Sequence, residues 1–175
     1  MPSSFKRNTN VPQVADKLVH PPSCNALTAQ PDPRNAVMDH TGLPCICTSS
    51  QLAGAGYRME HFIHCAFVAH DQLWDPAPSA PAYNLATSDG LPSLDRHLRP
   101  FIDAHWQLAT VVREHDLRST LLGDCLTVAP EPLHRATDRY PFGDKLRDAI
   151  VPLHGIAANS GLGEVDQTLS NTLVR

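Results

Sequence analysis

Sixteen prolines in 175 residues are the feature that most restricts how this chain can fold. Proline fixes the backbone angle φ and has no N–H, so it interrupts a helix or a sheet ladder except near its start or edge. Nine glycines add further points at which regular structure is expected to end. We therefore expect short elements joined by many loops, and not a bundle of long helices.

The breakers are unevenly distributed, and their distribution predicts the domain organisation. Residues 1–35 are rich in Pro, Asn and Ser, which predicts a mobile N-terminal arm. Residues 155–175 are polar, contain glycine and lack aromatic side chains, which predicts a weakly ordered C-terminal tail. The stretch between them, residues 36–154, is long enough for one domain with its own core.

The charges exclude some functional classes. The formal net charge is −4, and Lys and Arg are scattered singly, so nucleic acid is not expected as a partner. No apolar run reaches the roughly 20 residues that a membrane span needs, and the amino end lacks the apolar stretch of a Sec signal peptide. We expect a soluble protein that is cytoplasmic or is exported by a signal-independent route into another cell.

Local patterns predict a small antiparallel sheet packed against helices, and hence the α+β class. Thr48 is expected to cap a short helix that ends near Gly54 and has Cys45 or Cys47 at its amino end. Residues 57–69 alternate and are expected to form a central strand. A turn at residues 70–72 leads into a second strand, which Pro76 and Pro78 should stop.

Two later segments complete the expected elements. Apolar side chains recur at helical spacing from Leu94 to Val112, with Asp95 in the first turn and a break or kink at Pro100. Residues 121–128 are apolar and residues 144–150 are charged, and we expect a strand and a helix there. The long helical segment should cover the sheet.

His64 and Asp75 are the pair on which the functional prediction depends. They are eleven positions apart, and a turn centred between residues 69 and 70 would place them side by side on one face. A carboxylate in that place fixes the tautomer of an imidazole and stabilises its cation. The odd count of five cysteines indicates no regular disulfide framework, so thiols are available. A thiol at a helix start, as expected for Cys45, is stabilised as thiolate.

The segment from Cys45 to Pro76 resembles the papain-like cysteine hydrolases, including transglutaminase-like enzymes and papain-fold bacterial toxins and effectors. In those families a Cys begins a helix, a His follows on a strand, and an Asp, often as Asp-Pro, follows on the next strand. Cys45, His64 and Asp75 match in that order. The resemblance implies a papain-like core and a Cys45–His64–Asp75 triad, without metal or cofactor, acting on an amide or thioester of a protein or peptide.

Some assignments in this resemblance stay open. The interval between Cys45 and His64 is shorter than those families usually have, and Cys47 and Cys24 are alternative nucleophiles. A Gln or Asn for an oxyanion hole is not evident. Protease, deamidase and acyl-transferase share the acyl-enzyme chemistry, so the sequence does not choose among them.

The alternative prediction is a non-enzymatic binding or effector module with a structural zinc site. Six side chains of zinc-ligand type lie within 26 positions: Cys45, Cys47, His61, His64, Cys65 and His70. On a strand, however, His61 and His64 would point to opposite faces, so zinc would require a loop or a helix there. The zinc content of the purified protein distinguishes the two predictions.

Overall fold

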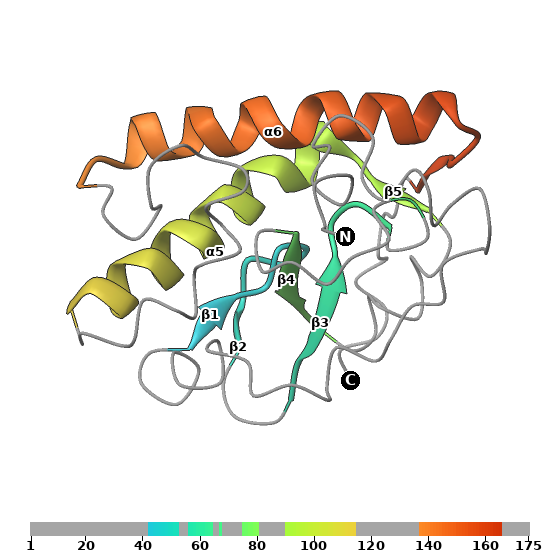
Figure 1. Ribbon diagram of the computed structural model, residues 1–175. Helices are drawn as coiled ribbons and strands as arrows, with labels where there is room; N and C mark the ends of the chain where they lie inside the picture. The colour runs from blue at the N-terminus through green and yellow to red at the C-terminus, as the bar shows by residue number, and fades with distance from the viewer. Residues whose placement is uncertain are drawn as a thin grey trace, which may run out of the picture.

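The computed structural model describes residues 42–52, 56–64, 67, 75–80, 90–114 and 137–165. In this part of the chain, short strands lie on one side of two long helices (Figure 1). Helices and small antiparallel sheets together confirm the predicted α+β class, while the papain-like core stays a prediction. The expected arm at residues 1–35 and the expected strand at residues 121–128 lie outside the described residues.

The first pair of strands is a tight hairpin. β1 (Leu43–Pro44) pairs antiparallel with β2 (Gln51–Leu52), and Leu43 is opposite Leu52. In the turn, the Ser49 N–H donates to the Cys45 carbonyl at 2.9 Å, and the Cys45 N–H donates to the Ser50 carbonyl at 2.9 Å. The predicted helix from Thr48 is therefore wrong. One helical turn forms, and Ser49, with φ of 57°, ends it.

Gly42 sets the entry to this hairpin. Its φ is +70°, and a Cβ built on it would lie 2.6 Å from the Leu52 carbonyl oxygen. The position therefore needs glycine both for its backbone angle and for the close approach of β2. The Gly42 carbonyl accepts a hydrogen bond from Gln107 Nε2 at 3.0 Å, which ties the hairpin to the long helix α5 (Leu94–Glu114).

The second pair of strands carries the polar residues of interest. β3 (Arg58–His61) pairs antiparallel with β4 (Pro76–Ser79), with Arg58 opposite Ser79 and His61 opposite Pro76. The predicted strand over residues 57–69 is thus too long, because β3 ends at His61. The prediction that Pro76 and Pro78 stop the second strand is also wrong, since both lie within β4.

The direction of the backbone groups explains how β4 accommodates two prolines. The Asp75 carbonyl faces β3 and accepts from the Phe62 N–H at 3.1 Å. The Pro78 carbonyl faces the other way and accepts from the Ile46 N–H at 3.2 Å. Backbone groups alternate along a strand, so the missing N–H groups of Pro76 and Pro78 lie on the β1 side. Ala77 and Ser79 remain to pair with β3.

Helices α5 and α6 (Arg139–Asn159) each have 21 residues, which contradicts the expectation of short elements. The helical predictions for residues 94–112 and 144–150 are confirmed, and Pro100 lies inside α5 without ending it. An internal proline costs about 3 kcal/mol, whereas each large apolar side chain buried contributes about 1.5–3 kcal/mol. The ten buried residues of α5 outweigh that cost: His97, Leu98, Phe101, Ile102, Ala104, His105, Leu108, Ala109, Val111 and Val112.

Local signals set the ends of α6. The Asp138 carboxylate accepts from the Tyr140 N–H at 2.9 Å, and Pro141 stands in the first turn, where its missing N–H is not needed. After the helix, Gly161 has φ of 100°, and the Leu162 N–H donates back to the Ala157 carbonyl at 3.2 Å. This is a glycine-dependent helix end.

The segment after residue 154 belongs to the fold as far as residue 165, unlike the weakly ordered tail expected from residue 155. α6 continues to Asn159, and β6 (Glu164–Val165) pairs in parallel with β5 (Leu91–Pro92). His154 Nε2 donates to the Pro92 carbonyl at 2.9 Å, so a buried side chain joins α6 to β5. Polar composition alone did not show that a strand partner lies 70 residues upstream.

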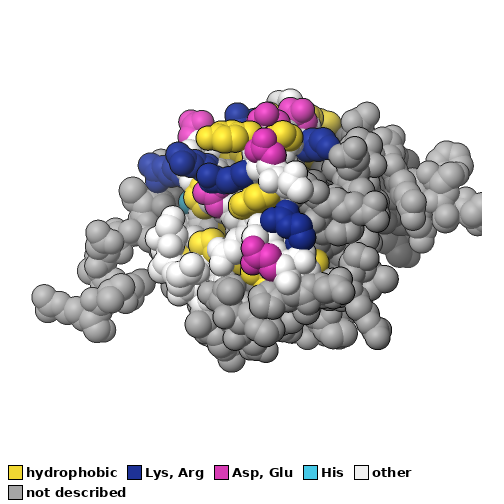
Figure 2. Space-filling view, turned by 90° about the vertical axis from the view of Figure 1, so that its left-hand side faces the viewer, with side chains coloured by type: hydrophobic (Ala, Val, Ile, Leu, Met, Phe, Trp, Pro, Cys, Tyr) yellow, Lys and Arg dark blue, Asp and Glu magenta, His cyan; other side chains and the backbone are white. Residues whose placement is uncertain are grey.

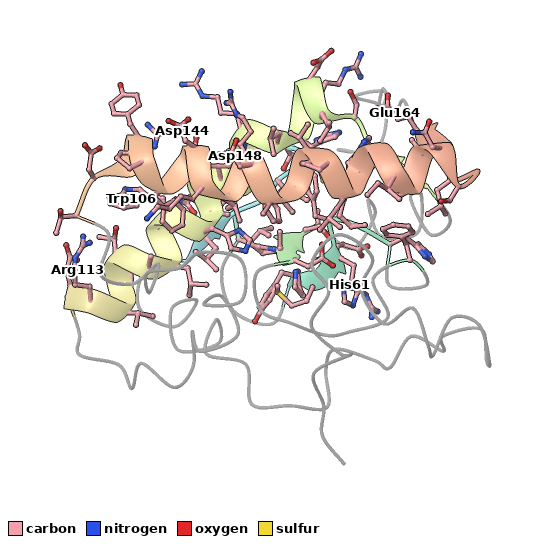
Figure 3. The ribbon with its side chains drawn as sticks, turned by 45° about the horizontal axis from the view of Figure 1, so that its top comes forward. His61, Trp106, Arg113, Asp144, Asp148 and Glu164 are labelled. Atoms are coloured by element: carbon pink, nitrogen blue, oxygen red, sulfur yellow. The ribbon has the colours of Figure 1, made fainter. Side chains whose placement is uncertain are left out.

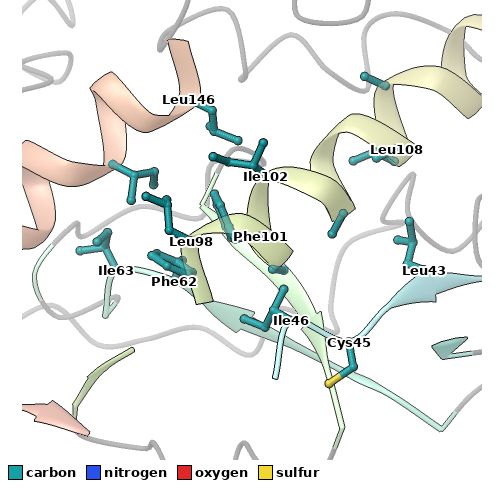
Figure 4. Close-up of a cluster of buried hydrophobic side chains, with 14 of the residues drawn as sticks. Leu43, Cys45, Ile46, Phe62, Ile63, Leu98, Phe101, Ile102, Leu108 and Leu146 are labelled. Atoms are coloured by element: carbon teal, nitrogen blue, oxygen red, sulfur yellow. The ribbon is translucent and has the colours of Figure 1, made fainter. Parts of the chain in front are cut away.

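α5 lies between the strands and α6, and the core fills both of its faces. α5 contacts β1 and β4, and α6 contacts α5 (Figure 1). Phe62 and Phe101 have ring centroids 4.3 Å apart (Figure 4). Trp106 and Phe142 have centroids 5.4 Å apart. Neither described helix is long and apolar enough to cross a membrane.

The outer face in Figure 2 carries basic and acidic side chains next to one another, among apolar ones. Arg139 of α6 makes an ion pair with Asp103 of α5, and both side chains are exposed. Tyr140 is the most exposed large hydrophobic side chain of the described residues, at 80%. Surface ion pairs of this kind contribute little to stability, so this face gives no argument for a site.

Candidate functional site

A buried polar contact joins His61 to Asp75. The Asp75 carboxylate is fully buried, and its Oδ2 lies 2.7 Å from His61 Nδ1. Its Oδ1 accepts from the Ile63 N–H at 2.8 Å. Two donors thus hold the carboxylate in one orientation, and the carboxylate in turn fixes the imidazole of His61, which is 10% exposed at the end of β3 (Figure 3).

Asp75 therefore has the predicted kind of partner, but the histidine is His61. Side-by-side alignment of His64 with Asp75 required a register two positions away from the observed one, in which the Phe62 N–H bonds the Asp75 carbonyl. A shift of two residues preserves the faces of a strand, so the alternation could not detect it. His64 lies after β3 in a half-buried position, where its carbonyl accepts from the Phe67 N–H at 2.8 Å.

Cys45 occupies the first position of the β1–β2 turn, and its side chain is fully buried. Its Sγ accepts from the Ala80 N–H at 3.4 Å, at the far end of β4. A hydrogen bond from the Cys47 side chain lowers the pKa of Cys45 most. Burial opposes this effect, and the Thr48 hydroxyl and backbone N–H groups of the turn add to it, giving a pKa of about 4 instead of 9.0.

The turn supplies what the predicted helix start was expected to supply. In both arrangements, backbone N–H groups converge on the sulfur and favour the thiolate. Figure 4 shows Cys45 at the edge of the hydrophobic cluster, next to Ile46. The prediction of a stabilised thiolate therefore has a physical basis here, although its expected element does not form.

The structure does not bring Cys45 and the His61–Asp75 pair together. Asp75 precedes β4 and Ala80 follows it, so the pair and the sulfur lie at opposite ends of that strand. Five residue intervals of extended chain span about 16 Å. Proton transfer between His61 and the Cys45 sulfur needs hydrogen-bond distance, and this separation is far larger.

Glu60 is a further titratable group beside the pair, and the sequence did not single it out. Its Oε1 is buried and has no hydrogen-bond partner among the described residues. Burial raises the pKa of Glu60 from 4.5 to about 7, while the nearby charges of His61 and Arg58 oppose the rise. A half-buried glutamate that precedes an imidazole on a strand has no distinctive spacing, so only the structure identifies it.

The zinc alternative finds no cluster in the described part of the chain. No group of three or more His, Cys, Asp or Glu side chains that could hold a metal ion occurs there. Cys65 and His70, two of the six predicted ligands, lie outside the described residues, as does the alternative nucleophile Cys24.

Comparison with known proteins finds no family model, no curated protein and no solved structure that matches this chain. The geometry of the chain's own residues therefore has to support any proposal of function.

Proposed function

We propose that this chain is a cysteine-dependent hydrolase or acyl-transferase that acts on an amide or thioester of a protein or peptide. The observation that carries the proposal is the buried His61–Asp75 pair, with 2.7 Å between Nδ1 and Oδ2. The proposal assigns the acid–base role to His61, in place of His64, and the orienting role to Asp75. The resemblance of residues 45–76 to papain-like enzymes supports the choice of a thiol as nucleophile.

The chemistry requires little beyond this pair and a thiolate. A thiolate attacks the carbonyl carbon, and the imidazolium of His61 gives its proton to the leaving nitrogen or sulfur. His61 then takes a proton from the water or amine that resolves the acyl-enzyme. Asp75 stabilises the imidazolium in both steps, because its carboxylate already bonds Nδ1 and so leaves Nε2 as the nitrogen that would carry the transferred proton.

The identity of the nucleophile is the part that the experiment must decide. Cys45 has the electronic property of a nucleophile, since its turn lowers its pKa to about 4. Its sulfur is not within hydrogen-bond distance of His61, because the two lie at opposite ends of β4. Cys24 is the other candidate that the sequence indicates outside this turn, and the test therefore treats the two thiols separately.

An acyl-enzyme trap tests the proposal without knowledge of the natural substrate. The native chain is incubated with p-nitrophenyl acetate, release of p-nitrophenol is followed, and the acetylated protein is digested with trypsin. Cleavage after Lys and Arg leaves Cys45 and Cys47 in residues 35–58 and Cys24 in residues 18–34. The mass of each peptide therefore shows whether the acyl group is on Cys24 or in the β1–β2 turn, and fragmentation of residues 35–58 distinguishes Cys45 from Cys47.

We expect one acetylated cysteine, and a His61→Ala variant that forms it about 10²–10⁴-fold more slowly. His64→Ala is the matched control and should stay within a few-fold of the parent. If acetylation slows in His64→Ala and not in His61→Ala, the acid–base role belongs to His64. Equal acetylation of all thiols, unaffected by either substitution, would remove the proposal altogether.

A further inference from the structure

Cys45 and Cys47 form a pair of neighbouring thiols whose joint chemistry the proposed hydrolase does not use. They are two positions apart in the β1–β2 turn, and the Cys47 side chain makes a hydrogen bond to that of Cys45. Both are free cysteines, and they differ in accessibility, since Cys45 is buried and Cys47 is half-buried. A reagent from solution therefore meets Cys47 first.

The backbone of the turn brings the two residues to a distance that suits a disulfide. The i to i+4 bond from the Ser49 N–H to the Cys45 carbonyl, at 2.9 Å, gives the turn helical curvature. Residues i and i+2 of a helical turn have Cα atoms about 5.4 Å apart. Disulfides join residues whose Cα atoms are about 4.4–6.8 Å apart, which this spacing meets. They also need side chains that turn towards one another, and the hydrogen bond between the Cys47 and Cys45 side chains brings the two sulfurs together, so closure requires a local adjustment of the turn.

We propose that Cys45 and Cys47 are a redox dithiol, which low-molecular-weight disulfides oxidise to a reversible disulfide within the turn. The Cys47 thiol loses its proton, attacks one sulfur of the disulfide RSSR, forms a mixed disulfide and expels RS⁻, which takes up a proton. The Cys45 thiolate then attacks the Cys47 sulfur and expels the second RS⁻. Two thiols are thereby oxidised by two electrons, and one RSSR is reduced to two thiols.

The hydrogen bonds to Cys45 make this disulfide easy to reduce. They stabilise the thiolate of the reduced form and are lost when the sulfur becomes part of the disulfide. The pKa of Cys45, about 4, lies three units below pH 7. Ionisation of this thiol therefore stabilises the reduced form about a thousand-fold relative to a pair of ordinary thiols. At 29.6 mV for each tenfold change, the reduction potential is about 90 mV higher.

The proton balance gives a sharp test on the unmodified chain. Oxidation by glutathione disulfide consumes one proton when Cys45 is already ionised, because both released glutathione molecules become protonated. The equilibrium constant for oxidation should therefore fall about tenfold for each pH unit between about pH 5 and pH 8. Two ordinary protonated thiols would give a constant that does not change over this range.

The experiment equilibrates the full chain in mixtures of reduced and oxidised glutathione, stops exchange with acid and alkylates the remaining thiols. Tryptic residues 35–58 contain Cys45 and Cys47 and no other cysteine, so the oxidised and the alkylated forms of this peptide are counted directly. Thr48→Val, which removes a donor to Cys45, should increase the oxidised fraction at pH 7. Thr110→Val makes the same chemical change in α5 and should leave the fraction unchanged.

Two results would overturn the proposal. One is a peptide that carries glutathione on Cys47 and never closes to the internal disulfide. The other is an oxidation constant that does not vary with pH. The test is independent of the proposed hydrolase, because His61→Ala should abolish acyl transfer and leave the glutathione equilibrium intact.

Discussion

Replacing Asp75 tests the central contact of the structure. Asp75→Ala removes two hydrogen bonds to a fully buried carboxylate, one from the Ile63 N–H at 2.8 Å and one from His61 Nδ1 at 2.7 Å. Hydrogen bonds to a charged group contribute about 1.5–3 kcal/mol each, and the donors left behind stay partly desolvated. We therefore expect a loss of about 3–5 kcal/mol in the free energy of unfolding.

The amide variant separates the two hydrogen bonds. In Asp75→Asn, the side-chain oxygen can still accept from Ile63, while the NH₂ group faces His61 Nδ1 and favours the wrong tautomer. We expect about half the loss of Asp75→Ala, together with a loss of acyl transfer that exceeds the change in stability.

Urea unfolding followed by tryptophan fluorescence measures both variants. For a slope of about 2 kcal/mol per molar urea, a loss of 4 kcal/mol lowers the midpoint by about 2 M. Asp148→Ala removes an exposed aspartate of α6 and serves as the control, with an expected change within about 0.5 kcal/mol. An Asp75→Ala midpoint equal to that of the control would refute a buried, structurally engaged carboxylate.

Three further predictions follow from single residues. The lowered pKa of Cys45 contributes stability that is complete above about pH 9 and lost as pH falls towards 4, so Cys45→Ala should flatten urea midpoints measured across this range. The raised pKa of Glu60 acts in the opposite sense. Stability falls as pH rises from 4.5 to about 7, and Glu60→Gln should be more stable than the parent at pH 8 and equal to it at pH 4. Gly42→Ala should cost more than about 1 kcal/mol in thermal unfolding, because φ is positive and the new Cβ would meet the Leu52 carbonyl, whereas Gly155→Ala in open space on α6 should stabilise by up to about 1 kcal/mol. If the dependence of stability on pH is the same in the Cys45 or Glu60 variant as in the parent, the shifted pKa of that residue is contradicted. If the two glycine variants melt at the same temperature, the special backbone position of Gly42 is contradicted.

The periodicity of α5 was the part of the fold that the sequence predicted best. An apolar face that repeats over 21 residues identifies a helix even when Pro100 interrupts it. The length of α6 was less accessible, because its buried positions are spaced among exposed charges and Pro152. β5, which pairs with β6 after this helix and accepts a hydrogen bond from His154, lies far away along the chain. Pairings over such separations depend on tertiary packing, which local patterns do not contain.

The candidate site was predictable in kind and not in register. Alternation and the Asp-Pro step predicted that Asp75 lies beside His64, whereas the imidazole that contacts Asp75 is that of His61. Choosing between His61 and His64 required the length of the connection, which is set by where β3 ends. The environment of Cys45 depends on a positive φ at Ser49, and a serine in the sequence does not predict that conformation.

The prolines of β4 also determine on which side, that of β1 or that of β3, the hydrogen bonds of this strand open first. On the β1 side Pro76 and Pro78 can accept hydrogen bonds but cannot donate them, and the bond from the Ile46 N–H to the Pro78 carbonyl crosses there at 3.2 Å. The β3 side keeps donors and acceptors from both strands, so its local opening costs more free energy. The Ile46 amide should therefore exchange its hydrogen with solvent sooner than the Phe62 amide. Gln107 holds Gly42 to α5, so the β1–β2 hairpin stays attached to that helix when its hydrogen bond to β4 opens.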